Sequence, residues 1–317
     1  MDNTNKVVLI TGSSSGFGKL IVELLSKKKF KVIATMRDIS GKNSKVADEL
    51  NRLGENVTIE ELDVTCSNSI KKTVTNTINN YSKIDVLVNN AGIMNVGLAQ
   101  GFTIPQLEKQ MDVNYIGVAR IFREVVPHMK KKKSGLFITV SSIAGRIIFP
   151  FLSTYNPSKF AVEALAEIYR YELSPFKIDS IIIEPGPFPT NLIQNSPRPE
   201  DTKCLEDYGE LANTAEQIMQ NFQEFMKNNP ECDSNLIPKA VAKLINLPYG
   251  KRPLRTVCGL DYGVNDINSM TEKYQLALIQ QMGLDKLIPS WEFGLWQSYF
   301  ISNRSFRHKN ISLKKKK

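Results

Sequence analysis

Two side chains that can exchange and stabilise a proton are four residues apart in the stretch STYNPSKF, residues 153–160. They are Tyr155 and Lys159, and residues at positions i and i+4 lie on the same face of a helix. A free phenol has a pKa of about 10, and a nearby ammonium group lowers it by favouring the phenolate. The spacing fits an ordinary helix-surface pair as well as a proton-transfer pair, so the rest of the chain must decide between them.

The proline between these side chains indicates where their helix begins. Proline is tolerated in the first turn of a helix, where the N–H groups have no partner within the helix. Pro157 therefore predicts a helix that starts near Ser153 or Thr154, either of which could cap it. Tyr155 is then expected in the first turn.

A second stretch suited to chemistry is TGSSSGFG, residues 11–18, directly after the first apolar run. Its three glycines allow a tight turn, a close approach of the main chain to phosphate, and close packing of a helix on a strand. We therefore predict a dinucleotide-binding loop with the pyrophosphate at the N-terminus of the first helix. The residues expected to form it are Gly12, Ser14, Ser15, Gly16, Phe17 and Gly18.

The same stretch also satisfies G-x-S-x-G, the motif that carries the nucleophile of many hydrolases. Ser14 would be that nucleophile and would need a histidine base. The chain has two histidines: His128 adjoins a run of lysines, and His308 lies in the basic terminal stretch. Neither position suits a base for Ser14, so we favour the nucleotide loop.

The end of the second apolar run, ATMRD at residues 34–38, bears on the choice of cofactor. An acid at this place would hold the ribose hydroxyls of NAD, whereas an arginine accommodates the 2′-phosphate of NADP. Met36 occupies the expected place of the acid, and the guanidinium of Arg37 can bind a phosphate through two hydrogen bonds. Asp38 comes one residue late and could instead tether Arg37. The sequence therefore favours NADP(H) over NAD(H).

Short apolar runs alternate with amphipathic segments through the first two thirds of the chain. The runs are rich in Val and Ile and nearly continuous, which is typical of a parallel sheet buried on both faces. This alternation predicts an α/β fold, a doubly wound parallel sheet of the Rossmann type. The expected strands are residues 6–11, 30–36, 57–64, 84–90, 136–142 and 178–185, with 254–258 as a last edge strand.

The regular alternation ends after residue 186, where a proline-rich stretch precedes helical segments. We expect one Rossmann-type domain over residues 1–260. Within it, residues 187–250 would form a mobile apolar lid over the substrate. A C-terminal extension (261–303) and a basic, disordered tail (304–317) would follow.

Composition and charge exclude several classes of protein. No apolar run approaches the ~18 residues that span a bilayer, and the N-terminus has no signal-peptide stretch. The four cysteines show no C-x-x-C spacing, as expected of free thiols in a reducing compartment. Seven of the nine net positive charges lie in residues 304–317, so the excess belongs to the tail. We expect a cytoplasmic protein with no nucleic-acid partner and no metal, while contact of the tail with an anionic surface stays open.

Seven motifs in one order resemble the short-chain dehydrogenase/reductase family, in particular its hydroxysteroid and retinol dehydrogenase-like branch. They cover about residues 6–191 and include both stretches described above. The motifs are TGSSSGFG, LDVT (62–65), NNAG (89–92), DVNYIG (112–117), VSSIAG (140–145), YNPSK (155–159) and EPGPFPTN (184–191).

The resemblance implies that Tyr155 is the catalytic acid/base and Lys159 its partner. Ser142, 13 residues before Tyr155, would bind the substrate oxygen, and Asn114 would support a proton-relay water. Ser141 is the alternative serine, but the spacing to the tyrosine favours Ser142. In this arrangement the lysine and a positively charged nicotinamide would lower the pKa of the tyrosine, as general catalysis near neutral pH requires.

The resemblance also implies a cofactor site along the same motifs. Lys159 would bridge the ribose hydroxyls and Tyr155 would lie beside the nicotinamide. The remaining residues are Asp63 and Val64 at the adenine, Asn90, Ala91 and Gly92 at the ribose, and Pro185, Gly186, Phe188 and Thr190 at the nicotinamide end.

The activity implied is an NADP(H)-dependent oxidoreductase that interconverts a carbonyl and a secondary alcohol, on a lipophilic small-molecule substrate. The resemblance also implies a homo-oligomer, a dimer or a tetramer. The alternative is a catalytically idle NADP(H)-binding sensor that retains the fold. The joint presence of Asn114, Ser142, Tyr155 and Lys159 argues against that alternative.

Overall fold

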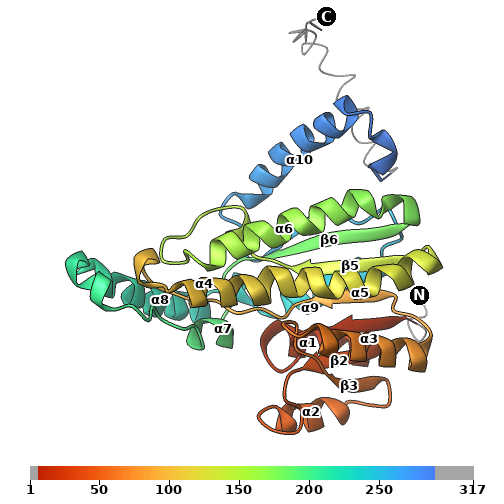
Figure 1. The fold of residues 1–317 in the computed structure, drawn as a ribbon, viewed down its shortest axis with the longest axis horizontal. Helices are drawn as coiled ribbons and strands as arrows, with labels where there is room; N and C mark the ends of the chain where they lie inside the picture. Colours follow the sequence, from red (N-terminus) through yellow and green to blue (C-terminus); the bar gives the residue numbers. More distant parts are fainter. Residues whose placement is uncertain (1–5, 290–317) are drawn as a thin grey trace, which may run out of the picture.

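A computed structural model describes residues 6–289 of the chain. Seven parallel strands form one sheet in the order β3-β2-β1-β4-β5-β6-β7 (Figure 1). All seven expected strands are present, with small differences at their ends. They are β1 (Val7–Ile10), β2 (Lys31–Met36), β3 (Val57–Glu61), β4 (Val86–Asn89), β5 (Gly135–Val140), β6 (Ile178–Pro185) and β7 (Arg255–Cys258).

Helices cover both faces of the sheet, which confirms the doubly wound α/β fold. Alternate side chains of β1 enter the two cores: Val8 and Ile10 pack with helices of one face, and Val7 and Leu9 with helices of the other. This explains why the strand is apolar at every position. The first face carries α1 (Gly16–Lys27), α2 (Ser44–Asn51) and α9 (Leu236–Asn246), and the second carries α3 (Ser67–Tyr81), α5 (Gly117–Lys132) and α6 (Tyr155–Glu172).

The strand order places a topological switch point between β1 and β4. The chain goes from β1 to β2 and β3 on one side, then returns to β4 on the other side of β1. In open α/β sheets, ligands bind beyond the carboxyl ends of the strands at such a point. The glycine loop follows β1 and the NNAG motif begins at the end of β4, so both lie at this point.

The remaining helices belong to the carboxyl side of the sheet and to the C-terminal part. In Figure 1, α8 lies at one end of the molecule and α10 projects from the body. The sequence reading did not identify α10, whose inner residues Leu276 and Ile279 pack against Tyr171. The proposed boundaries of the lid and the extension stay predictions, and the tail 304–317 lies outside the described residues. These helices are α4 (Ile104–Met111), α7 (Asn191–Gln194), α8 (Leu211–Asn228) and α10 (Val264–Gln281).

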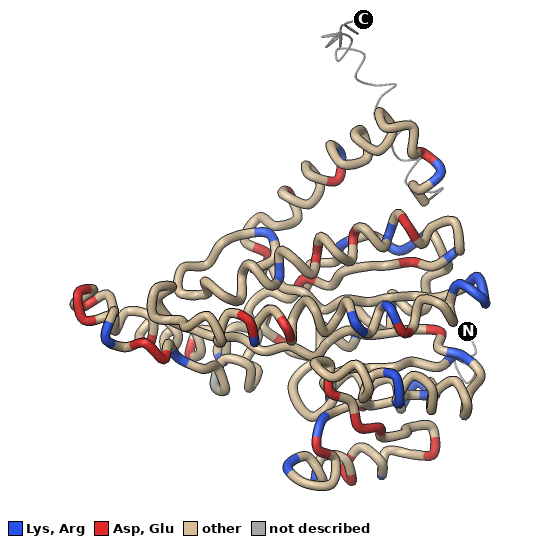
Figure 2. Tube along the Cα trace, viewed as in Figure 1, with Lys and Arg blue, Asp and Glu red and all other residues tan. Residues whose placement is uncertain are grey.

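Charged residues of both signs are mixed over the described body, as the blue and red segments of Figure 2 show. This distribution agrees with assigning most of the positive excess to the last fourteen residues of the sequence. Within residues 6–289, none of the helices has the length and apolarity needed to cross a membrane.

A buried ion cluster joins α6, β6 and the segment after α9. The guanidinium of Arg170 lies 3.0 Å from one carboxylate oxygen of Asp179, and that of Arg252 contacts the other oxygen. Arg170 also donates to the main-chain oxygen of Arg252 at 2.8 Å. Breaking a buried ion pair leaves a charge without compensation, so this cluster fixes three elements of the core together.

Replacing the shared carboxylate tests this role. We expect Asp179→Ala to lower the free energy of unfolding by about 3–5 kcal/mol, because two buried guanidinium groups lose the carboxylate that they share. Glu49→Ala, which removes the exposed pair with Lys19, should leave the free energy of unfolding nearly unchanged. Urea denaturation of both variants measures the difference, and similar small losses would contradict the assignment.

Candidate active site

The glycine loop has the backbone that its sequence predicts. Gly12 and Gly16 have φ values of +69° and +53°, in the left-handed region that favours glycine. A Cβ atom on Gly18 would lie 2.2 Å from the main-chain oxygen of Gly12, so the helix packs closely on the turn. The N-cap of α1, Ser15, makes no side-chain capping bond. The first N–H groups of the helix therefore suit an anionic ligand.

Side-chain hydrogen bonds tie this loop to the end of β4. The hydroxyl oxygen of Thr11 accepts the N–H groups of Asn90 and Ala91, both at 3.0 Å. The side-chain amide of Asn90 donates back to the main-chain oxygens of Thr11 and Gly12, again at 3.0 Å. The amide nitrogen of Asn90 thus holds the glycine loop, and the role expected for residues 90–92 at the ribose stays a prediction.

The end of β2 presents a guanidinium group at the surface. Arg37 is exposed and, within residues 6–289, no hydrogen bond or ion pair engages its side chain. The idea that Asp38 tethers it is wrong: the Asp38 carboxylate accepts the main-chain N–H of Lys42 at 2.8 Å. Arg37 lines a cavity of about 690 Å³ with Thr65 and residues from α4 to Ile116.

Asp63 and Val64, expected at the adenine, follow β3 beside this cavity. One carboxylate oxygen of Asp63 accepts both the N–H and the hydroxyl of Thr65, at 2.8 and 2.7 Å. This local turn fixes the loop after β3. Val64 packs against Gly117, where an added Cβ would lie 3.0 Å from the valine side chain.

Asn114 lies in a π-helical turn, Asp112–Ile116, between α4 and α5. Such turns insert a residue into a helix and re-aim its side chains. The buried amide of Asn114 accepts the N–H of Ile93 and donates to its main-chain oxygen, both at 2.9 Å. It also donates to the hydroxyl of Ser158 at 3.0 Å. Asn114 thereby joins the segment after β4 to the helix that carries Tyr155 and Lys159.

The two serines after β5 have different surroundings. Ser141 is buried and donates to the carboxylate of Glu163 at 2.8 Å. Ser142 caps the turn that follows, accepting the N–H of Ala144 at 3.1 Å, and hydrogen-bonds to Tyr155. The structure therefore places Ser142, the serine favoured by the spacing, beside the tyrosine.

The helix of the Tyr155–Lys159 pair begins where Pro157 predicts. Tyr155 is the first residue of α6 and Thr154 its N-cap, although no side chain caps the helix. Tyr155 and Lys159 are each 7% exposed. The ammonium of Lys159 donates to the main-chain oxygen of Val140 at 3.0 Å and lies 5.5 Å from the centroid of the Tyr155 ring.

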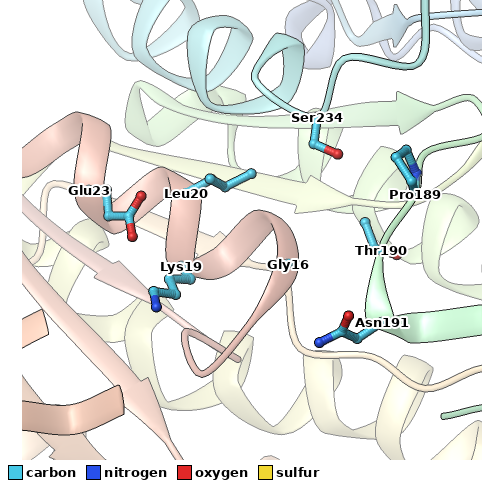
Figure 3. A pocket seen from close by; sticks show the side chains of 8 residues that line it. All are labelled: Gly16, Lys19, Leu20, Glu23, Pro189, Thr190, Asn191 and Ser234. Atoms are coloured by element: carbon cyan, nitrogen blue, oxygen red, sulfur yellow. The ribbon is translucent and has the colours of Figure 1, made fainter. Parts of the chain in front are cut away.

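The motif after β6 runs towards the glycine loop. Gly186 donates its N–H to Cys258 at 2.9 Å, and a Cβ there would lie 2.2 Å from the main-chain oxygen of Leu260. Phe188 is buried, with its ring edge-on to Phe17 at 5.4 Å. Figure 3 shows the continuation of this segment facing the start of α1 across a cavity of about 280 Å³. The lining residues are Gly16, Lys19, Leu20, Glu23, Pro189, Thr190, Asn191 and Ser234.

Comparison with known proteins assigns the family. The family model described as short chain dehydrogenase matches residues 6–201, more than half of the chain. The chain belongs to the short-chain dehydrogenase family. It is therefore an oxidoreductase, and the family read from the seven motifs is confirmed.

Individual relatives of this dehydrogenase support the assignment. It is 35% identical to 3-ketodihydrosphingosine reductase of Bacteroides thetaiotaomicron over 65% of this chain and 72% of the relative. It is 36% identical to human retinol dehydrogenase 8 over 58% of this chain and 60% of that protein, less than two thirds of its length. The solved structure of ElxO with NADP bound is 25% identical, with a TM-score of 0.65, over 83% of this chain and 99% of the other.

The hydrolase alternative has no base in the described part of this dehydrogenase. His128 is exposed near the end of α5, which leads to the start of β5. It therefore lies at the amino edge of the parallel sheet, opposite to Ser14 in the glycine loop. His308 lies outside residues 6–289. Within those residues, no group of three or more His, Cys, Asp or Glu could hold a metal ion.

Burial sets the protonation of the central pair. It raises the pKa of Tyr155 to about 12, and the hydrogen bond with Ser142 opposes this rise. In the protein without cofactor, desolvation is therefore the dominant influence on the pKa of Tyr155, and the lowering expected from Lys159 in the cofactor complex stays a prediction. Burial also lowers the pKa of Lys159 to about 8, against the opposing charge of Glu163. The effect of a positive nicotinamide stays a prediction.

A buried charge network behind Ser142 escaped the sequence reading. Glu163 and Glu167 on α6 and Glu184 on β6 surround the guanidinium of Arg255 on β7. The side chain of Asn268 on α10 donates to Glu184 at 2.5 Å. Two signals were present in the sequence: Glu163 follows Lys159 by one helical turn, and Glu184 interrupts an apolar strand.

Glu184 should make the stability of the dehydrogenase depend on pH. Burial and the nearby charge of Glu163 raise its pKa to about 8. The unfolded state releases the proton of Glu184 near pH 4.3, whereas the folded state keeps it up to about pH 8. The free energy of unfolding therefore falls as the pH rises from about 4.5 to 8, and above that range this group causes no further loss. Glu184→Gln should flatten the fall in melting temperature over this window. Glu55→Gln at the exposed surface should not, and equal slopes in all three proteins would contradict the assignment.

Proposed function

We propose that this oxidoreductase interconverts a carbonyl and a secondary alcohol with NADP(H), on a lipophilic substrate, and that Tyr155 is its acid/base. The observation that carries the proposal is the convergence of Ser142, Tyr155 and Lys159 at the carboxyl edge of the sheet. Hydrogen bonds through Asn114 connect this edge to the segment that holds the glycine loop. The same groups were expected from motifs that cover about residues 6–191 of the chain.

The residues at the switch point fit a nicotinamide dinucleotide. The open N-terminus of α1 and the left-handed glycines would hold the pyrophosphate. Asp63 and Val64 would flank the adenine, Ala91 and Gly92 the ribose, and the segment from Pro185 to Thr190 the nicotinamide end. Once bound, the cofactor supplies or accepts the hydride.

NADP(H) is preferred in this proposal because of Arg37. Its guanidinium is exposed at the end of β2, beside the cavity where the adenosine end would lie. No acidic side chain takes the place after β2 that would hold ribose hydroxyls, since Asp38 binds its own loop. ElxO, a structural neighbour, is solved with NADP.

The three side chains then have separate roles. With a pKa of about 12, Tyr155 keeps its phenolic proton near neutral pH, which is the form that donates a proton to an alkoxide. The hydroxyl of Ser142 would stabilise the developing oxyanion. The ammonium of Lys159 would bind the ribose hydroxyls and favour the phenolate after the proton has left. Asn114 would fix this helix and support the relay water.

A lipophilic substrate fits the surroundings of the tyrosine. Tyr155 belongs to a continuous apolar cluster that extends into the segment after β6. The members of this cluster that follow β6 in the chain include Phe188, Ile193, Met219 and Met226. Methionines adapt to irregular apolar shapes, as a lid over a lipid-like substrate requires. The named relatives reduce a ketosphingoid or oxidise retinol according to their names, both lipophilic.

Two further expectations stay predictions. Phe160 and Ile168 are exposed on α6, the helix expected to mediate a dimer or tetramer, and light scattering would measure the assembly. The cytoplasmic location is the other expectation, and fractionation of cells would test it.

Removing the phenolic hydroxyl tests the mechanism. Tyr155→Phe should lower kcat by about 10²- to 10⁴-fold, the usual contribution of general acid–base catalysis, while cofactor affinity is largely kept. The matched control is Tyr169→Phe, on the same helix, whose ring stacks on Phe122 with centroids 4.4 Å apart. Turnover of a ketone panel is followed by the absorbance of reduced nicotinamide. Normal kcat in Tyr155→Phe would refute the role, and cofactor binding without any turnover in the wild type would favour the idle sensor.

Removing the guanidinium at β2 tests the cofactor preference. Arg37→Ala should weaken NADPH by about 10- to 100-fold, the loss of charged hydrogen bonds, and leave NADH unchanged. Lys42→Ala removes another exposed cation from the same loop and should have little effect. Fluorescence titration gives both dissociation constants. Tighter binding of NADH by the wild type, or equal losses for both cofactors in Arg37→Ala, would exclude this preference.

A further inference from the structure

Glu163 is the member of the buried network that touches the strand end carrying Ser142. Its side chain is 2% exposed, and its two oxygens have different partners. One accepts the hydroxyl of Ser141 at 2.8 Å, and the other lies 3.2 Å from Nε of Arg255. A buried carboxylate with both oxygens engaged has one orientation, so it can transmit that orientation to its neighbours.

The turn after Ser142 leaves room for this carboxylate because residue 145 is a glycine. A Cβ on Gly145 would lie 2.4 Å from the oxygen of Glu163 and 2.9 Å from the hydroxyl of Ser141. Its backbone does not need the left-handed region, so space rather than conformation explains the glycine. The VSSIAG motif is thus built around the bond between Ser141 and Glu163.

Glu163 also acts on Lys159, which lies one turn earlier on α6. The negative charge of the carboxylate raises the pKa of Lys159 and opposes the effect of burial. The ammonium itself is bonded to Val140, the residue before Ser141. Lysine and glutamate therefore hold successive residues at the end of the same strand.

We propose that Glu163 is a positioning residue of the reaction: through Ser141 it fixes the strand end that presents Ser142, and it places a negative charge one helical turn from Lys159. This rests on the function proposed above. Glu163 itself touches neither substrate nor cofactor in this scheme. It acts through Ser141 and Lys159.

Other charged groups surround Glu163 and enter any pH effect. Lys159 and Glu167 share its helix, Glu184 faces it from β6, and Arg255 from β7. From α10, Asn268 bonds to Glu184. Glu272 on the same helix has a raised pKa because of burial, an effect that Arg255 opposes. Loss of the charge of Glu163 therefore affects Lys159 and Glu184 together.

The test compares Glu163→Gln with Glu167→Gln in the cofactor-loaded enzyme. Both remove one carboxylate from Arg255, but the partners of Glu167 are Arg255 and Tyr171. We expect Glu163→Gln to move the high-pH limb of kcat for ketone reduction down by about one pH unit, because Lys159 loses its proton earlier. Glu167→Gln should leave the limb in place. Identical limbs in the wild type and both variants would overturn the charge role.

A measurement without turnover separates this inference from the proposed function. In the wild type without added cofactor, the melting temperature should fall with rising pH until Glu184 has lost its proton. In Glu163→Gln this fall should end at a lower pH, because Glu184 no longer has the like-charged neighbour that raises its pKa. A fall over the same pH range as in the wild type would overturn the coupling between Glu163 and Glu184. If the wild type reduces no ketone, the proposed function fails, while this measurement still reports on the network.

Ser141→Ala tests the positional role and replaces Glu163→Gln if that variant does not fold. It removes only the hydrogen bond and keeps the carboxylate. We expect kcat to fall about tenfold, since small misplacements of reacting groups are costly, with the high-pH limb unchanged. Glu163→Asp, which keeps the charge but shortens the reach, should show the same pattern. Wild-type kcat in both variants would overturn the positioning role.

Discussion

The hydroxyl of Thr11 is the contact on which the candidate site depends, because it joins the glycine loop to the segment after β4. It accepts two successive main-chain N–H groups after β4, from Asn90 and Ala91. The next residues reach Ile93, whose N–H and C=O are both bonded to Asn114. Asn114 in turn donates to Ser158, which donates to the main-chain oxygen of Tyr155 at 2.7 Å. Hydrogen bonds and short peptide segments thus connect β1 to the first turn of α6.

This continuity has an energetic reason. The groups at the carboxyl edge are buried polar groups, and each costs free energy unless it is bonded. Asn114 uses both donors of its amide nitrogen within the protein. The arrangement therefore resists small displacements, which hydride and proton transfer at one carbon and its oxygen both require.

The fold and the centre of the site were accessible from the sequence for different physical reasons. The strands were found because burial on both faces makes β1 apolar at every position and gives β6 the run Ile181–Ile183. The start of α6 was found because proline is tolerated best in the first turn of a helix, where Pro157 lies. Ser142 was chosen over Ser141 by its spacing from the tyrosine, and the structure gives the latter serine a different partner, Glu163.

Other features could not be read from the sequence because they depend on contacts between distant segments. Arg255 and Glu163 are 92 residues apart, and nothing local indicates that β7 brings them together. The π-helical turn at Asn114 is a change in the main-chain hydrogen-bond pattern between α4 and α5, which the residue types do not reveal. The burial of Tyr155, which raises its pKa in the protein without cofactor, was not visible because the sequence shows its charged neighbour and not its surroundings. Asp38 could have tethered Arg37 by its position in the sequence, but its carboxylate accepts the main-chain N–H of Lys42 in its own loop.

The two sides of the site are built from different interactions, and this bears on how the chain can vary. The chemical side is held by main-chain groups, amides and buried charges, where one lost atom leaves a partner unsatisfied. The side facing the substrate comes from the segment after β6, where Met219 and Met226 pack into the cluster of Tyr155 without hydrogen bonds. Apolar contacts are not directional, so this side can change shape at small cost. Under the proposed function, substrate choice would therefore be set after β6, independently of the groups that would transfer the proton.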